Sequence, residues 1–424
     1  MENFIIEGGS PISGTIRAQG NKNAALPAIA AALLTDQTVR LHNVPRIGDV
    51  IALLDIISEV GVLVDWTGDD LVINAASIEA LPLDDKLCRK LRGSVLLVAP
   101  LLFRRQKISL PFPGGDRIGR RRLDTHLLAL SALGAEITVG DGVKIAAPRG
   151  LRGTDLWLDE ASVTATENTI MAAVLAEGAT TIYHAACEPH VQELCRLLGA
   201  MGANIDGIGT NRLTIVGVKN LRGAEFTLGA DYLEVASLLT LAALTGGELL
   251  IENASPQYLP MILRQFRRIG LVGEIVGENL RVPKKQPLEV ALDFRGVMPT
   301  IDDAPWPGFP ADLTSIAVVA ATQTRGSLLI HEKMFESRLY FVDRLIEMGA
   351  KIVLCDPHRA VIIGHSPLHG AKIASPDIRA GMALLIASMC AEGESTINNI
   401  EQIDRGYETI DRRLRALGAK ITRA

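Results

Sequence analysis

Hydrophobic and polar positions follow one order several times along this chain. A run of small apolar residues, typical of a buried helix, is followed by a β-branched strand, a polar loop and an amphipathic helix that ends at a glycine. Near the C-terminus this order predicts a helix over 381–390, a strand over 395–397, a loop to Arg405 and a helix over 407–417. Each terminal glycine is expected to be the C′ residue that lets the helix turn into the next strand.

The helix-ending glycines recur about 70 residues apart, a spacing typical of repeat architectures. They are Gly61, Gly134, Gly202, Gly270, Gly349 and Gly418. A βαβ-type repeat cannot bury its sheet alone, and 424 residues are too many for one ordinary core. We therefore predict an α/β protein of six repeats in two domains: 21–230 for repeats one to three, and 1–20 with 231–424 for repeats four to six. The first twenty residues would then supply a strand to the second domain.

Composition and charge indicate a soluble globular protein. Hydrophobic residues make up 48% of the chain, enough for sizeable cores. A net charge of −5 and only 4% aromatic residues argue against a nucleic-acid partner. There is no basic segment leading into an apolar one at the start and no apolar run of membrane-spanning length, so we expect a cytoplasmic protein without a membrane partner.

The cysteine pattern does not predict a metal site, and the absence of the known nucleotide-binding motifs means that no cofactor is expected. The five cysteines are scattered, so reduced core thiols are expected. Four potential ligands cluster between 184 and 195, but their spacing matches no standard zinc pattern. They are His184, Cys187, His190 and Cys195. No GxxxxGK[ST] motif occurs, and no strand leads into GxGxxG, so neither a P-loop nor a dinucleotide site is expected.

The most unusual stretch is a loop over 112–122 in the second repeat, which we expect to be mobile. Residues 113–122 read PGGDRIGRRR, with three glycines, one carboxylate and four arginines. Glycine lets a backbone approach a ligand closely, and arginine suits phosphate and carboxylate. An anionic ligand that neutralised the arginines would raise the pKa of Asp116 and allow it to deliver a proton. The alternative is a solvated hairpin loop.

Arginine recurs in the equivalent loop of other repeats, as Arg46 in the first, Arg338 in the fifth and Arg405 in the sixth. Helix N-termini favour acidic rather than basic residues. The recurring guanidinium therefore favours an anionic ligand, and we predict an anion-lined cleft between the domains. The alternative is that arginine is simply common at helix ends.

The first apolar helix opens with GNKNAALP over 20–27. Lys22 beside the amides of a helix N-terminus would form a phosphate seat, and Pro27 is tolerated if it lies in the first turn. The alternative is an asparagine cap beside a solvated lysine.

Polar residues precede the first helix of other repeats as well. Asp231, Asp312 and Asp377 stand at the starts of these helices in repeats four, five and six. Capping explains all three acids, and one or two at most are expected to be chemical. Residues 162–168 (SVTATEN) precede a helix predicted over 169–176, where they would bind a polar ligand or cap the helix.

Eight short motifs are spread over essentially the whole chain. They are 22–27 (KNAALP), 91–94 (LRGS), 113–119 (PGGDRIG), 162–168 (SVTATEN), 307–313 (PGFPADL), 335–338 (FESR), 377–380 (DIRA) and 403–408 (IDRGYE). Together they resemble the enolpyruvyl transferase family. The lysine motif is more similar to the branch that acts on UDP-N-acetylglucosamine than to the branch that acts on shikimate 3-phosphate.

The resemblance implies an EPSP synthase-like fold, in which each of the two domains is an inside-out α/β barrel. It also implies transfer of the enolpyruvyl group of phosphoenolpyruvate to the 3′-hydroxyl of UDP-N-acetylglucosamine, with release of phosphate. This reaction is the first committed step of peptidoglycan synthesis. Loop closure would exclude water from the site.

The resemblance also assigns residues to the site. Lys22, Arg121 and Arg405 would hold phosphoenolpyruvate with help from Asn23, Asp116 would transfer a proton, and Asp312 would accept the proton of the acceptor hydroxyl. The nucleotide sugar would be lined by Arg92, Arg121, Leu123, Asp124, Ser162, Val163 and Met334. The motifs add Arg338, Asp377 and Arg379 to the predicted substrate site.

Asp116 occupies a position where many members of the family carry cysteine. A carboxylic acid can perform the same proton transfer, but a carboxylate is a poorer nucleophile than a thiolate. We therefore expect the epoxide antibiotic fosfomycin, which alkylates that cysteine, to fail against this protein.

Five further residues differ from the family's usual pattern, most of them on the acceptor side. They are Thr164 for glycine, Arg122 for proline, Ala311 for threonine, His190 for glutamate and Tyr232 for arginine. Enolpyruvyl transfer to another nucleotide and a non-catalytic, sugar-nucleotide-binding paralogue therefore stay open. RNA 3′-phosphate cyclases are built from similar repeats, but the last repeat here offers no histidine nucleophile. The sequence does not predict an oligomeric state.

Overall fold

The computed structural model describes residues 2–79, 81–116 and 118–424. The chain forms two compact units. The N-terminal unit is Gly20–Asp116 with Arg121–Gly229, and the C-terminal unit is Met1–Gln19, Arg117–Arg120 and Ala230–Ala424. The boundaries predicted after residues 20 and 230 lie one residue from these, whereas the prediction kept all of loop 112–122 with 21–230.

The C-terminal unit contains three four-stranded sheets of the same design, in which two neighbouring strands are parallel and the other pairs are antiparallel. The first contains β15 (Glu274–Val276), β16 (Asn279–Val282), β14 (Leu249–Glu252) and β2 (Gly14–Arg17). The second contains β17 (Thr300–Asp302), β18 (Gly326–His331), β20 (Arg359–Gly364) and β19 (Lys351–Asp356). The third contains β21 (Lys372–Ala374), β22 (Glu394–Asn398), β1 (Asn3–Glu7) and β23 (Lys420–Arg423).

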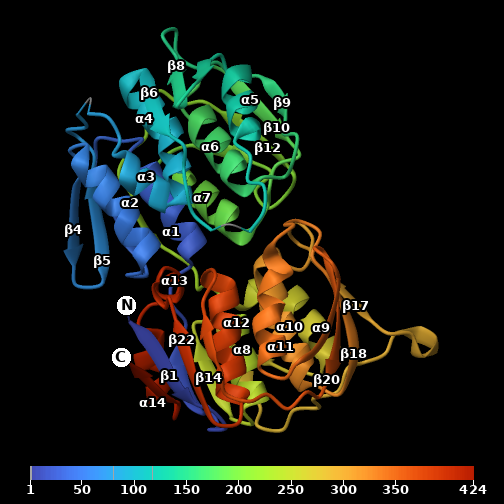
Figure 1. The fold of residues 1–424 in the computed structure, drawn as a ribbon. Coiled ribbons are helices and arrows are strands. Elements are labelled where there is room, and N and C mark those ends of the chain that lie inside the picture. The colour runs from blue at the N-terminus through green and yellow to red at the C-terminus, as the bar shows by residue number, and fades with distance from the viewer. Residues whose placement is uncertain (1, 80, 117) are drawn as a thin grey trace. The chain divides into compact units, whose positions relative to one another are not determined.

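Three helices that are apolar on every side form the centre of this unit: α8 (Tyr232–Leu244), α10 (Thr314–Gln323) and α12 (Ile378–Cys390). Nearly all of their residues are buried, as expected for helices without a polar face. They pack on one another, and β1, β14, β18 and β22 lie around them (Figure 1). Helices inside and sheets outside are the inside-out arrangement, so the fold class is confirmed.

Shorter or amphipathic helices connect the strands of the C-terminal unit. They are α9 (Pro260–Ile269), α11 (Val342–Glu347), α13 (Glu401–Asp404) and α14 (Ile410–Ala416), with 3₁₀ turns η2 (Pro256–Tyr258), η3 (Phe294–Gly296), η4 (Ala311–Leu313) and η5 (Arg338–Phe341). The N-terminal residues complete two of the three sheets, since β2 pairs parallel with β14 and β1 lies antiparallel between β22 and β23.

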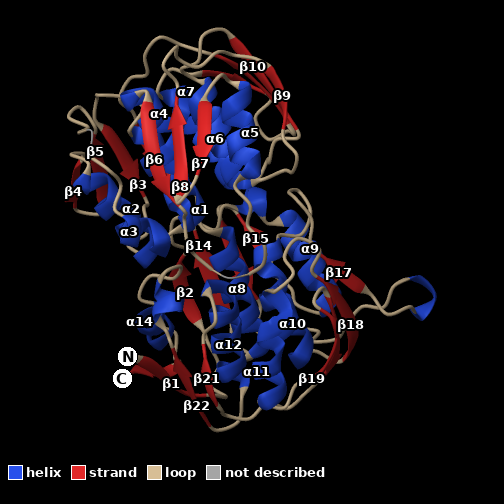
Figure 2. Ribbon diagram, turned by 45° about the horizontal axis from the view of Figure 1, so that its top comes forward, coloured by secondary structure: helices blue, strands red, loops and turns tan. Residues whose placement is uncertain are grey.

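The N-terminal unit repeats the design with two four-stranded sheets and one three-stranded sheet. The four-stranded sheets are β13 (Glu225–Thr227), β3 (Val39–His42), β5 (Asp70–Asn74), β4 (Leu63–Thr67), and β11 (Asn204–Asp206), β12 (Arg212–Val216), β10 (Ala179–Tyr183), β9 (Asp155–Trp157). Figure 2 shows the strands of the third sheet side by side: β6 (Lys107–Pro111), β8 (Gly142–Ala146) and β7 (Glu136–Val139).

The helices of the N-terminal unit include two buried ones, α1 (Lys22–Ala32) and α6 (Val163–Ala173). The others are α2 (Gly48–Glu59), α3 (Asp85–Lys90), η1 (Arg92–Leu97), α4 (Val98–Arg105), α5 (Asp124–Ala132) and α7 (Pro189–Ala200). Across the described residues of both units, no helix combines the length and the apolar character needed to span a bilayer.

The six helix-ending glycines all have positive φ. The values are 87° at Gly61, 99° at Gly134, 105° at Gly202, 90° at Gly270, 104° at Gly349 and 102° at Gly418. Side chains rarely adopt this conformation, so glycine is the residue that lets the helix turn into the next strand. The predicted C′ role is confirmed at five of the positions, whereas Gly270 takes the C-cap position of α9 itself.

Substitutions at two of these glycines can separate the cost of backbone strain from the cost of a steric clash. Gly202 has open space where a Cβ would lie, so Gly202→Ala is expected to lower the free energy of unfolding by about 1 kcal/mol through φ alone. A Cβ at Gly270 would lie 2.4 Å from the backbone nitrogen of Glu289, so Gly270→Ala should cost at least about 2 kcal/mol more. Urea unfolding of both variants measures the difference, and equal losses would contradict this account.

Several predicted boundaries were wrong. Helix α6 begins at Val163 rather than 169, so most of the 162–168 motif is helical, and α14 begins at Ile410 because Thr409 has a φ of 42°. Pro27 lies in the sixth position of α1, beyond the first turn in which it had been placed.

Not all of the cysteines are core thiols. Cys88 and Cys195 are buried, Cys187 and Cys390 are half-buried, and Cys355 is exposed on β19. The expectation of reduced core thiols therefore fails at Cys355.

Candidate active site

Asp312 is the centre of the predicted residues in the C-terminal unit. It lies in the 3₁₀ turn η4, which precedes the buried helix α10. Arg338 Nη2 donates to its Oδ1 at 2.8 Å, and Arg379 Nε donates to its Oδ2 at 3.3 Å. Both arginines are buried, while the side chain of Asp312 keeps 31% of its surface exposed. Two buried cations therefore hold a carboxylate that a substrate can reach.

The structure separates the three acids that the sequence could not distinguish. Asp231 accepts from the backbone N–H groups of Leu233 and Glu234 and caps α8, and Asp377 caps α12 through two N–H groups in the same way. Asp312 does not cap α10, whose N-cap position belongs to Leu313. The extra turn η4 displaces Asp312 from the capping position and leaves its oxygens for the arginines.

Arg379 joins this carboxylate to the buried end of the sixth repeat. Its Nη1 donates to the hydroxyl oxygen of Tyr407 at 3.2 Å, and its backbone N–H donates to the capping carboxylate of Asp377 at 2.8 Å. Burial raises the pKa of Tyr407, so the phenol stays protonated. Asp377 holds the first turn that presents Arg379, and its predicted role in binding substrate stays a prediction.

Other predicted residues of this unit lie on short turns. Arg405 directly follows α13, is half-buried, and donates from Nη1 to Gln402 Oε1 at 2.8 Å. Met334 is 40% exposed, and its backbone N–H donates to Asp303 Oδ2 at 3.2 Å.

Residues 118–120 of the arginine-rich loop pack against the turn that precedes η5. The Ser337 N–H donates to the carbonyl of Ile118 at 3.1 Å, and the Arg120 N–H donates to Glu336 Oε2 at 3.1 Å. Gly119 has a φ of 144°, and a Cβ there would lie 2.2 Å from Glu336 Oε2. The positive φ favours glycine at this position. Arg117 of the predicted cluster lies outside the described residues.

Lys22 is the centre of the predicted residues in the N-terminal unit. Asn21 caps α1 by accepting from the Asn23 N–H at 2.8 Å, which places Lys22 at the first helical position. The Lys22 ammonium lies 3.1 Å from Asp49 Oδ2, and both side chains are about nine-tenths buried. The proposed phosphate seat is thus an ion-paired lysine rather than a solvated one. Asp49 could not be singled out from the sequence, because an acid in the first turn of a helix such as α2 is an ordinary feature.

Asp49→Asn is expected to raise the KM for phosphoenolpyruvate about tenfold, with a smaller change in kcat. The amide keeps the size of the side chain but removes the charge that holds the ammonium in place. Steady-state kinetics with phosphoenolpyruvate as the varied substrate measure this change. An unchanged KM would show that the ion pair is purely structural.

The glycines at the start of the loop pack closely against Arg89 and Arg92. A Cβ at Gly114 would lie 1.6 Å from the carbonyl oxygen of Arg89, and one at Gly115 would lie 2.9 Å from Arg92 Cβ. The predicted approach of this loop to a ligand stays a prediction. The two glycines let the loop lie on the α3–η1 turn, immediately before the half-buried Asp116.

Arg92 fixes the other end of the same loop. Its Nη2 donates to the carbonyls of Arg121 and Arg122, each at 2.9 Å. Burial and the nearby charge of Arg121 lower the pKa of Arg92 to about 10, so the guanidinium stays charged at neutral pH. Arg92 thus orders the loop backbone, besides any contact with a substrate.

The predicted acceptor residues gather at the starts of two helices of the N-terminal unit. Leu123 takes the N-cap position of α5 and Ser162 that of α6, and Asp124 and Val163 are the first residues of those helices. Arg122 Nε lies 2.7 Å from Asp124 Oδ2, so the residue that departs from the family pattern pairs with a predicted substrate residue.

Thr164, another departure, is joined to a buried histidine that sequence analysis missed. Thr164 Oγ1 lies 3.1 Å from His126 Nε2, and Asn168 Nδ2 lies 3.0 Å from His126 Nδ1. Burial, reinforced by the charge of Arg92, lowers the pKa of His126 to about 3, so the ring is neutral. The departure at Thr164 is therefore accommodated by a specific partner.

The remaining departures are packing positions. Tyr232 is 2% exposed, and its ring lies 6.4 Å from that of Tyr258 and 5.8 Å from that of Trp306. Ala311 and His190 are also buried.

Arg46 differs from the other loop arginines. It stacks on Trp66 at 4.3 Å in the β4–β5 hairpin and donates to the carbonyl of Gly68. Its predicted part in anion binding stays a prediction.

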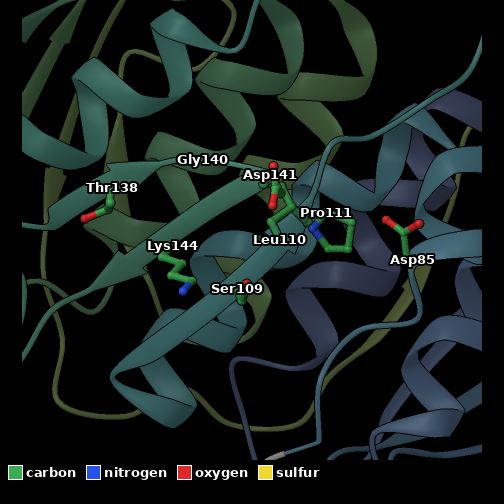
Figure 3. A pocket seen from close by; sticks show the side chains of 9 residues that line it. Asp85, Ser109, Leu110, Pro111, Thr138, Gly140, Asp141 and Lys144 are labelled. Atoms are coloured by element: carbon green, nitrogen blue, oxygen red, sulfur yellow. The ribbon is translucent and has the colours of Figure 1, made fainter.

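A pocket of about 480 Å³ lies over the outer face of the three-stranded sheet (Figure 3). Ser109, Thr138 and Lys144 project into it from β6, β7 and β8, and Asp85 faces it from α3. None of the predicted site residues lines it. The pocket is therefore separate from the residues that carry the proposed chemistry.

Comparison with known proteins places the chain in a family. Residues 6–414 match the family model described as EPSP synthase (3-phosphoshikimate 1-carboxyvinyltransferase). The fold is similar to that of the enolpyruvyl transferase NikO from Streptomyces tendae, with a TM-score of 0.87 at 22% identity over 100% of this chain and 99% of the other. It is also similar to EPSP synthase from Acinetobacter baumannii, with a TM-score of 0.75 at 19% identity over 100% of both chains.

Relatives of much higher identity align along the whole length. UDP-N-acetylglucosamine 1-carboxyvinyltransferase from Borrelia garinii subsp. bavariensis is 54% identical over 99% of both chains. The protein of the same name from Bradyrhizobium diazoefficiens is 55% identical over 99% of this chain and 97% of its own length. The chain therefore belongs to the EPSP synthase family of enolpyruvyl transferases.

Proposed function

We propose that this protein transfers the enolpyruvyl group of phosphoenolpyruvate to the 3′-hydroxyl of UDP-N-acetylglucosamine and releases phosphate, the first committed step of peptidoglycan synthesis. The observation that carries the proposal is the Asp312 carboxylate, held by Arg338 and Arg379 and open to solvent on one side. Full-length relatives that are 54% and 55% identical and bear the name of this activity support the choice of acceptor.

The reaction requires two proton movements, and the chain offers a carboxyl group for each. Asp116 protonates the CH₂ carbon of phosphoenolpyruvate while the acceptor oxygen bonds to the adjacent carbon, and Asp312 takes the hydroxyl proton. In the tetrahedral adduct, the methyl group then loses a proton and the carbon–oxygen bond to phosphate breaks, which forms the enol ether and free phosphate. No cofactor enters this scheme.

Buried and loop cations supply the electrostatic part of the mechanism. Lys22, Arg121 and Arg405 neutralise the phosphate and carboxylate of phosphoenolpyruvate, with Asn23 assisting, and stabilise the charge that develops as the adduct forms. Arg92, Arg121, Leu123, Asp124, Ser162, Val163 and Met334 would line the nucleotide sugar. The cytoplasmic location expected from the sequence stays a prediction.

Release of phosphate from phosphoenolpyruvate tests the proposal directly. UDP-N-acetylglucosamine, UMP and shikimate 3-phosphate are supplied as separate acceptors, with Asp116→Ala as the control. Release with UDP-N-acetylglucosamine alone, lost in the control, is the expected result. Release with another acceptor would replace the proposed substrate, and release with none would favour a non-catalytic, sugar-nucleotide-binding role.

A further inference from the structure

A buried carboxyl group, Glu332, lies directly behind the arginine that holds Asp312. It follows β18, and Asp303 follows the neighbouring parallel strand β17, so the two acids stand side by side where the strands end. Glu332 is 0% exposed and Asp303 is 1% exposed. No sequence motif singles out either residue.

Glu332 and Asp312 approach the same guanidinium. Glu332 Oε2 lies 3.9 Å from Arg338 Nε, while Arg338 Nη2 donates to Asp312 Oδ1 at 2.8 Å. Among the described residues, Glu332 Oε2 and Arg338 Nε are buried and make no hydrogen bond. These two buried atoms are less than 4 Å apart, so only a small movement would join them.

The rest of the Glu332 environment is fixed. Its Oε1 accepts from the Phe335 N–H at 3.2 Å, and the ring of Phe335 lies 5.0 Å from the Arg338 guanidinium. Its backbone N–H donates to the His358 carbonyl at 2.8 Å, and its carbonyl oxygen lies 2.7 Å from His358 Nδ1.

The charged groups around this carboxyl group include Asp303 from the β17 end and Arg338 from η5. Asp303 accepts the backbone N–H groups of Lys333 and Met334, and the Lys333 ammonium pairs with Asp302. His358 faces Glu332 from the β19–β20 turn, and Thr314 faces it from α10. Arg338 is therefore the cation that Glu332 can share with Asp312.

We propose that Glu332 is a positioning residue for the transfer reaction: it fixes where the Arg338 guanidinium lies and thereby orients the Asp312 carboxylate toward the acceptor hydroxyl. This inference rests on the proposed function. Burial, reinforced by the adjacent Asp303, raises the pKa of Glu332 from its ordinary 4.5 to about 8, while the Arg338 charge opposes the shift. At neutral pH the group is thus uncharged, and Arg338 directs its charge to Asp312.

The proton on Glu332 gives the proposal a pH signature. Above pH 8 the ionised Glu332 competes with Asp312 for Arg338, so kcat is expected to fall about tenfold over the next two pH units. Glu332→Gln cannot ionise, and it should keep kcat within about threefold of the unsubstituted protein at pH 7 and retain it at high pH. Glu332→Ala should lose at least about tenfold in kcat at every pH, with little change in the KM for phosphoenolpyruvate.

Two variants separate positioning from stability. Asp411→Asn removes a buried acid that pairs with Arg415 and Arg423, and it serves as the control for a loss of stability. If Glu332 acts through Arg338, then Glu332→Ala should add little to the effect of Arg338→Lys on kcat. Additive effects, an unchanged kcat in Glu332→Ala, or the same pH profile for Glu332→Gln and the unsubstituted protein would overturn the proposal.

Two further measurements do not depend on activity. They distinguish a failure of this inference about Glu332 from a failure of the proposed function. The folded chain keeps the Glu332 proton to a higher pH than the unfolded chain, so the contribution of Glu332 to stability falls as the pH rises from 4.5 to 8. Because glutamine does not ionise, the Tm of Glu332→Gln should rise relative to that of the unsubstituted protein across that interval. In arginine-labelled protein, the Nε–H signal that is absent from Arg338→Lys should broaden in Glu332→Ala. A constant Tm difference and an unaltered signal would overturn the inference even for an inactive protein.

Discussion

Replacing Asp312 by asparagine is expected to lower kcat by about three orders of magnitude, without raising the KM for phosphoenolpyruvate. Asparagine has nearly the same size and can still accept a hydrogen bond from Arg338, but an amide cannot take the proton of the acceptor hydroxyl. The loss therefore falls on the transition state rather than on binding. Steady-state phosphate release with each substrate varied in turn gives both constants.

Asp231 supplies the matched control, because it starts the equivalent helix of another repeat. It accepts from the backbone N–H groups of Leu233 and Glu234, and asparagine is as good an N-cap as aspartate. Asp231→Asn should therefore keep kcat within about threefold of the unsubstituted protein. Equal losses in the two variants would show that any acid-to-amide change at these helix starts disturbs the unit, and full activity of Asp312→Asn would remove Asp312 from the chemistry.

The second large effect concerns the residue that replaces the family's loop cysteine. The unsubstituted protein is expected to keep its activity during incubation with fosfomycin, whereas Asp116→Cys should be inactivated at least about a hundredfold faster, because a thiolate is far more nucleophilic than a carboxylate. The rate of inactivation is measured from the activity that remains after increasing times of incubation with fosfomycin. Intact mass shows whether one molecule of the drug is attached to the loop peptide.

Cys355 is exposed and would react without any relation to the site, so the experiment is made in a Cys355→Ser background. Asp116→Ala should be neither active nor modified. Rapid inactivation of the unsubstituted protein with the drug on Asp116 would contradict the assignment of this residue as a poor nucleophile.

The repeat architecture could be predicted because its signals are local. A helix that ends and turns into a strand needs a positive φ at one residue, and the glycines at six regular positions indicate where this happens. An apolar pattern on all sides of a helix likewise predicts that the helix is buried. The pattern could not locate the starts of α6 and α14, which depend on capping and on the φ of Thr409.

The types of residue in the site could be predicted from the sequence, but the side chains with which each of them pairs could not. Three acids at equivalent helix starts look alike in sequence, and only the turn η4 makes Asp312 different from Asp231 and Asp377. Asp49 was missed because it pairs with Lys22 from another helix, and Glu332 was missed because the sequence does not show how the turn after β18 brings Arg338 back toward it. Such pairings depend on tertiary packing, and no local pattern encodes them.

The strands β1 and β2 determine the order in which the units can be completed during synthesis on the ribosome. β1 lies between β22 and β23, so the C-terminal unit needs residues 3–7 and residues 420–423 at the same time. The N-terminal unit is drawn from residues 20–116 and 121–229, all of which are made before residues 230–424. It can therefore fold first, as N-terminal domains generally do. Nascent β1 is therefore an unpaired strand that must stay free of other partners until β22 and β23 have been made.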